Sequence, residues 1–85
     1  MDFEKTDYDI DGTARYKTVI DGEKVFIHIT REALDDDLTE GLTPDKQVKL
    51  AAIVTARLAS GQLEPQPDKI GVVIDVILIR NGDLA

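Results

Sequence analysis

The stretch "TARYKTVIDGEKVFIHIT", residues 13–30, decides the fold of this chain. Asp21-Gly22 separates two runs rich in β-branched and aromatic residues, and this pair favours a two-residue type I′ turn because both turn positions need a positive φ. Pairing outward from the turn gives four opposed pairs, which share a face: Ile20–Glu23, Thr18–Val25, Tyr16–Ile27 and Ala14–Ile29. The sequence therefore predicts a β-hairpin with one mostly apolar face.

The other face of this hairpin gathers basic side chains around an aromatic ring. We identify five residues there as a candidate interaction face: Arg15, Lys17, Lys24, Phe26 and His28. Such a surface on a sheet can bind single-stranded nucleic acid. The net charge of −7 disfavours this reading, because its field repels nucleic acid. The alternative is that the acidic N-terminus or an acidic partner covers this face.

Two helices are predicted after the hairpin. Thr30 is a suitable N-cap for a short first helix, which Gly41 can end. Thr43 caps the second helix, Pro44 occupies its first position, and Gly61 closes it. The second helix has one broad apolar face rich in alanine, so we expect it to pack closely against a sheet or another helix.

The segment "IGVVIDVILIR", residues 70–80, predicts a long C-terminal strand that is apolar on both faces. Such a strand must be covered on both faces, and one pair of helices covers only one face of a small sheet. The uncovered face therefore predicts either dimerisation or burial under a terminal arm, and we expect a homodimer. The candidate self-association residues are Ile53, among the basic residues of the second helix, and Val73, Ile77 and Ile79 of the strand.

The segment "QLEPQPDK", residues 62–69, predicts a connector because its two prolines disfavour regular structure. The predicted element order is therefore ββααβ. This order indicates a two-layer α+β domain with two helices on a small, mostly antiparallel sheet. We assign this single domain to residues 13–85 and interpret residues 1–12 as an acidic N-terminal arm.

Metal binding is not expected at either acidic run. The stretch "DYDIDG", residues 7–12, begins like a calcium-binding EF-hand loop. Counted from Asp7, the position where such a loop needs a bidentate glutamate is Thr18, and a strand follows instead of a helix. The run Asp35–Asp37 lies on a helix, where successive side chains point about 100° apart, so we interpret it as a solvated face.

The amino-acid composition argues against several further kinds of site and classes of protein. The 85 residues include no cysteine, so disulfides and thiolate metal sites are excluded. Ser60 ends a helix, and His28, the sole histidine, is interpreted as a half-exposed strand residue beside Arg15. We therefore expect no catalytic residue, no cofactor and no enzymatic activity. No apolar run approaches the roughly 20 residues of a membrane span and no secretory signal begins the chain, so we expect a cytoplasmic location and no membrane partner.

Several stretches together resemble the bacterial family catalogued as domain of unknown function 1488. They are "DYD" at residues 7–9, "RYKTVIDG" at 15–22, "VFIHITREAL" at 25–34, and the apolar strand ending in "GDL". The resemblance implies a ββααβ two-layer fold and supplies no activity or catalytic residue. We therefore predict a small bacterial protein that acts as a non-enzymatic protein-interaction or accessory module. The alternative is a ligand- or single-stranded nucleic-acid-binding module that uses the outer face of the hairpin.

Overall fold

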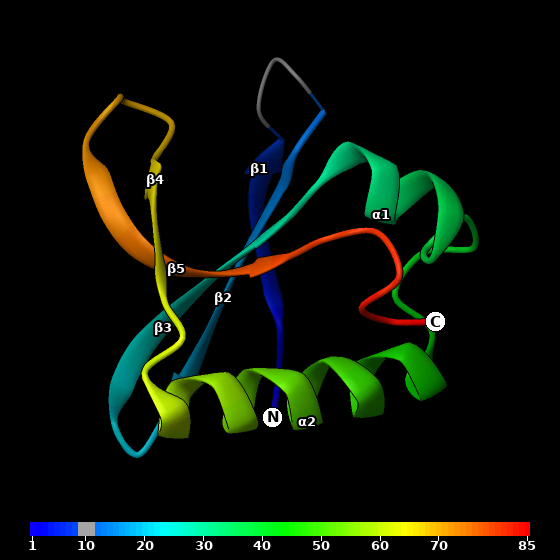
Figure 1. Ribbon diagram of the computed structural model, residues 1–85, viewed down its shortest axis with the longest axis horizontal. Coiled ribbons are helices and arrows are strands. Elements are labelled where there is room, and N and C mark those ends of the chain that lie inside the picture. Colours follow the sequence, from blue (N-terminus) through cyan, green and yellow to red (C-terminus); the bar gives the residue numbers. More distant parts are fainter. Residues whose placement is uncertain (9–11) are drawn as a thin grey trace.

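The computed structural model of the chain describes residues 1–8 and 12–85. Within these residues, five strands form one sheet in the order β1-β2-β3-β5-β4, and two helices complete an α+β domain, as predicted (Figure 1). The elements in chain order are β1 Glu4–Tyr8, β2 Ala14–Ile20, β3 Glu23–Ile29, α1 Arg31–Asp36, α2 Pro44–Ser60, β4 Glu64–Pro67 and β5 Val73–Ile79.

The central hairpin forms in the predicted register. β2 and β3 pair antiparallel from Ile20 opposite Glu23 to Ala14 opposite Ile29. The turn residues both have positive φ, 52° at Asp21 and 80° at Gly22, as a type I′ turn requires. The local turn chemistry and the alternation of side chains are therefore sufficient to determine this part of the sheet.

The predicted caps also form, although α1 is shorter than expected. The Thr30 and Thr43 hydroxyls accept hydrogen bonds from the Ala33 and Lys46 amides, each at 3.3 Å. Gly61 ends α2 with a φ of 71°. α1 ends at Asp36, well before Gly41, because the amides of both Asp37 and Leu38 bond to the Ala33 carbonyl and so close the helix.

The core lies between the helices and the inner face of the sheet. β3 pairs with β5 in parallel, which sets Ile27 beside Ile77 and Ile29 beside Ile79. The side chains in this core that are fully shielded from solvent are Ala14, Ile27, Ile29, Ala33, Leu50, Val54, Ile77, Ile79 and Leu84. The helices thus bury Ile77 and Ile79, so these two residues are not at the surface where self-association was expected.

Two strands of the sheet, β1 and β4, are not predicted from the sequence. β1 lies within the supposed N-terminal arm, where it pairs with β2, and Phe3 beside it packs against the core. β4 lies within the supposed connector and pairs with β5, with Pro65 opposite Asp75. β4 is an edge strand, where a proline is tolerated because its missing amide need not face a partner. The observed order is therefore βββααββ, and the predicted ββααβ corresponds to β2, β3, α1, α2 and β5 without β1 and β4.

Candidate functional site

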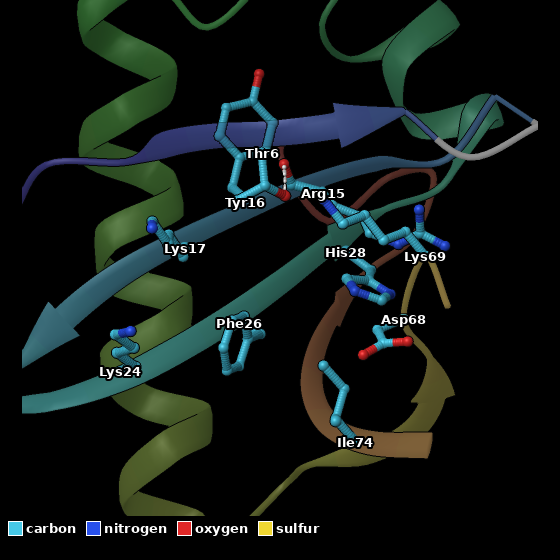
Figure 2. Close-up of a pocket in the computed structure, with 10 residues that line it drawn as sticks. All are labelled: Thr6, Arg15, Tyr16, Lys17, Lys24, Phe26, His28, Asp68, Lys69 and Ile74. Carbon is cyan, nitrogen blue, oxygen red and sulfur yellow. Dashed lines mark hydrogen bonds between the residues drawn. The ribbon is translucent and has the colours of Figure 1, made fainter. Parts of the chain in front are cut away.

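A pocket of about 270 Å³ lies on the outer face of the sheet, opposite the helices (Figure 2). All five residues of the predicted interaction face line it: Arg15, Lys17, Lys24, Phe26 and His28. The β4–β5 hairpin adds Asp68, Lys69 and Ile74, and β1 adds Thr6. We call this site the basic pocket. Nothing in the sequence placed the β4–β5 hairpin beside the central one.

The pairing of β5 explains how the two hairpins meet. β5 pairs with β3 only at Ile77–Ile79, while its first half pairs with β4. This first half curves away from β3 and carries the β4–β5 turn with it (Figure 1). Ile74 and the turn residue Asp68 thereby come to line the same pocket as Phe26 of the central hairpin (Figure 2).

The β4–β5 turn is held by its own hydrogen bonds. The Asp68 carboxylate accepts from the amides of Ile70 at 2.9 Å and Val72 at 3.0 Å, and the Asp68 amide donates to the Val72 carbonyl at 2.8 Å. An aspartate bonding to the amides that follow it is a common way to fix a turn. The turn that carries Lys69 at the pocket is therefore held in place by hydrogen bonds within the chain itself.

The pocket concentrates positive charge on an acidic protein. Its lining holds four basic side chains and one carboxylate, although the chain as a whole carries −7. Arg15 and His28 are buried, at 6% and 4% exposure, so the expectation of a half-exposed histidine was wrong. Lys24 and Lys69 are exposed at the rim. The pocket thus presents exposed lysines at its rim above buried Arg15 and His28.

β1 joins the sheet as a strand paired with β2, where it adds Thr6 to the lining of the basic pocket, and does not fold across this face as a separate arm. The Thr6 hydroxyl donates to the Arg15 carbonyl at 3.1 Å, which fastens β1 beside β2. Glu4 lies 3.9 Å from the Lys17 ammonium, an exposed ion pair of the kind that contributes little. Of the calcium-like stretch, Asp9 and Asp11 lie outside the described residues. Among the residues that are described, no cluster of three acidic or histidine side chains could hold a metal ion.

The other predicted self-association residues have different positions. Ile53 is half-buried and packs against the core, whereas Val73 is 65% exposed. Val73 belongs to an exposed apolar group with Ile70 and Val72, 75% and 52% exposed, at the end of the β4–β5 hairpin. We call these three residues the hairpin tip. The sequence predicts that all three residues belong to the long C-terminal strand, although Asp68 and Gly71 nearby signal a turn.

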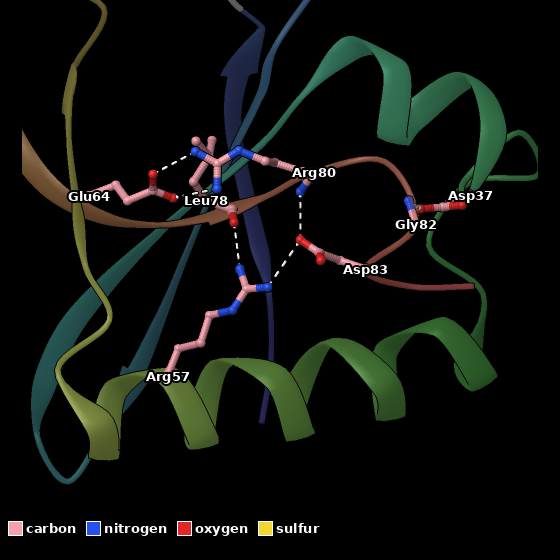
Figure 3. A network of polar contacts seen from close by, with 7 residues as sticks. All are labelled: Asp37, Arg57, Glu64, Leu78, Arg80, Gly82 and Asp83. Carbon is pink, nitrogen blue, oxygen red and sulfur yellow. Dashed lines mark hydrogen bonds and ion pairs between the residues drawn. The ribbon is translucent and has the colours of Figure 1, made fainter.

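A polar network lies on the helix side of the molecule and has a structural role (Figure 3). Arg57 on α2 donates to the Leu78 carbonyl at 2.5 Å and pairs with Asp83 at 3.0 Å. Asp83 also accepts from the Arg80 amide at 2.7 Å, and the Arg80 guanidinium binds both carboxylate oxygens of Glu64. These contacts fasten the C-terminal turn to α2 and β4.

The acidic residues at the end of α1 also help to attach the C-terminal turn to the rest of the molecule. Asp37 accepts from the Gly82 amide and Asp36 from the Asn81 side chain, each at 2.8 Å. These two carboxylates are therefore hydrogen-bonded to the C-terminal turn. Asp35 and Asp36 are exposed, as predicted for a solvated face, whereas Asp37 is half-buried.

Acid should weaken this network. Burial raises the pKa of Asp83. Hydrogen bonds from the Arg80 amide and the Arg57 side chain, together with the charges of both arginines, outweigh this effect and hold the pKa below the ordinary aspartate value of 3.8. The hydrogen bond from Arg80 lowers the pKa of Glu64 below its ordinary 4.5. A group whose pKa is lower in the folded than in the unfolded protein stabilises the fold at pH values above its unfolded-state pKa. This stabilisation is lost as the pH falls through the folded-state pKa.

We therefore expect the free energy of unfolding to decline as the pH falls below about 4.5, and Asp83→Asn to flatten this decline. Urea unfolding followed by circular dichroism across this range measures the effect. Asp45→Asn, on the first turn of α2 and outside the network, is the control. An Asp83→Asn profile parallel to that of the wild type would contradict the assignment.

No helix among the described residues has both the length and the apolar character needed to cross a membrane. Comparison with known proteins gives no match to a family model, a curated protein or a solved structure. The resemblance to the family of unknown function, the homodimer and the cytoplasmic location therefore stay predictions.

Proposed function

We propose that this chain is a non-enzymatic protein-interaction module whose basic pocket binds an anionic segment of a partner. The observation that supports this most directly is the convergence of Lys17, Lys24 and Lys69 on one pocket from three different strands or turns. The lining holds four lysine and arginine side chains and one carboxylate, so the local field of the pocket favours a negative ligand although the chain carries −7.

The second candidate is a module that binds single-stranded nucleic acid on the same face. Phe26 favours it, because an aromatic ring among basic side chains can stack with a base. The charge of the whole chain favours a protein segment instead. A nucleic acid strand carries a phosphate at every nucleotide and meets the net field over its full length, whereas a few carboxylates meet mainly the local field of the pocket.

A pair of matched charge reversals tests the proposal. Lys24→Glu changes the rim of the pocket, and Lys49→Glu makes the same change at an exposed position on α2. With a short polyglutamate peptide as the probe, we expect Lys24→Glu to weaken binding about tenfold, because it replaces an attraction by a repulsion. Lys49→Glu changes the net charge equally, so it should weaken binding only about twofold.

Nuclear magnetic resonance titration of the labelled protein measures both affinity and location. The expected result is saturable shifts at the amides around Lys17, Lys24 and Lys69 with the wild-type protein. Equal weakening by the two variants would contradict a local site. Tighter binding of oligothymidylate than of polyglutamate, at equal charge and salt, would favour the nucleic-acid alternative.

A further inference from the structure

We infer that the basic pocket and the hairpin tip form one two-part docking site for a short peptide that places carboxylate side chains next to large apolar ones. The inference rests on the proposed function and specifies the partner. Its two parts take different chemistry: the pocket takes the carboxylates, and Ile70 and Val72 of the tip take the apolar side chains. Val73 precedes the pocket residue Ile74 in β5 and so faces the other side of the sheet.

The two parts are continuous along the chain. The hairpin tip lies between Lys69 and Ile74, and both of these residues line the basic pocket. Its three apolar residues are more than half exposed, at 75%, 52% and 65%. The turn that carries them is fixed by the two amide hydrogen bonds to Asp68. A preformed surface of this kind spares a ligand the cost of ordering the loop.

The charges inside the pocket select an anion. Asp68 is the carboxylate in its lining, and it already accepts two backbone amides, while Lys24 and Lys69 stand at the rim. The volume of about 270 Å³ lies just below the roughly 300–1,000 Å³ of sites that enclose a drug-sized molecule. A space of this size suits one or two anchoring side chains of a longer chain.

The apolar tip distinguishes a peptide from the other anionic partners. A nucleic acid strand offers phosphates to the pocket, but its sugar-phosphate backbone gives Ile70 and Val72 little apolar surface. An anionic membrane offers both kinds of contact, but it presents an extended negative surface to a protein of charge −7. A peptide with a few carboxylates beside leucine or phenylalanine satisfies both parts without that repulsion.

The experiment uses a short peptide probe with two glutamates flanked on each side by leucine, in a glycine–serine background. Two control peptides replace the glutamates by glutamine or the leucines by serine. The protein variants are Val72→Ser at the tip and Val48→Ser on α2, a matched control because both valines are more than half exposed, at 52% and 71%. Titration of the labelled protein by nuclear magnetic resonance gives the dissociation constant and the contacted amides.

We expect shifts at both the pocket and the tip, with each control peptide binding about fivefold weaker or worse. Val72→Ser should weaken the binding of the leucine-containing peptide about threefold, and Val48→Ser should leave its affinity unchanged. If the serine control peptide binds as tightly as the probe, or the two valine variants behave alike, the inference is overturned while the proposed function stands.

The remaining outcomes separate the other occupants. Loss of all peptide binding, including polyglutamate, overturns both the inference and the proposed function. Tighter binding to oligothymidylate, or to phosphatidylserine-containing vesicles, overturns the peptide assignment. Concentration-dependent self-association that Val72→Ser abolishes, measured by sedimentation equilibrium, assigns the tip to a second copy of the chain and overturns the inference too.

Discussion

Ile77→Ala is expected to lower the free energy of unfolding by about 2–5 kcal/mol, the usual cost of deleting a fully buried aliphatic side chain. Ile77 has no exposed surface and lies beside Ile27 between the sheet and the helices. Because the cavity forms inside one chain, the loss should not depend on protein concentration. Urea unfolding at two concentrations measures both quantities.

Val73→Ala on the same strand is the matched control. Val73 is 65% exposed, so its truncation should change the free energy of unfolding by no more than about 0.5 kcal/mol. If Ile77→Ala were as mild as Val73→Ala, the core position of Ile77 would be wrong. If its effect grew on dilution, Ile77 would belong to an interface between chains, as the sequence alone suggested.

Arg57→Met is expected to lower the free energy of unfolding by about 1–3 kcal/mol, because it leaves polar groups without a charged partner. Arg57 donates to the carbonyl of Leu78, a residue only 8% exposed, and it pairs with Asp83. Methionine keeps most of the apolar stem, so the loss reports mainly the missing hydrogen bonds. Urea unfolding at neutral pH measures it.

Arg80→Met provides the comparison within the same network. The side chain of Arg80 is 58% exposed, and its pair with Glu64 is open to solvent, so removing it should have a clearly smaller effect than removing Arg57. Equal losses from the two variants would mean that burial does not set the strength of these contacts, contrary to the arrangement in Figure 3.

The candidate site was predictable only in part. Arg15, Lys17 and Phe26 could be placed on one face because side chains alternate along a strand and the Asp-Gly turn fixes the pairing. The other wall of the pocket, with Lys69 and Ile74, could not be placed. Its position depends on how far β5 pairs with β3, and this length is set by packing between segments about 50 residues apart in the chain.

The sequence by itself determined the central hairpin, its register, the caps at Thr30 and Thr43, and the basic side chains of the outer face. These features follow from turn chemistry and from alternation over a few residues, which act within a short stretch of chain. Only the tertiary structure decided that β1 and β4 complete the sheet, that Ile77 lies in the core, and that the β4–β5 hairpin closes one side of the pocket. The apolar sequence of a strand shows that other elements must cover it. Which elements cover it depends on contacts between segments that are distant in the chain.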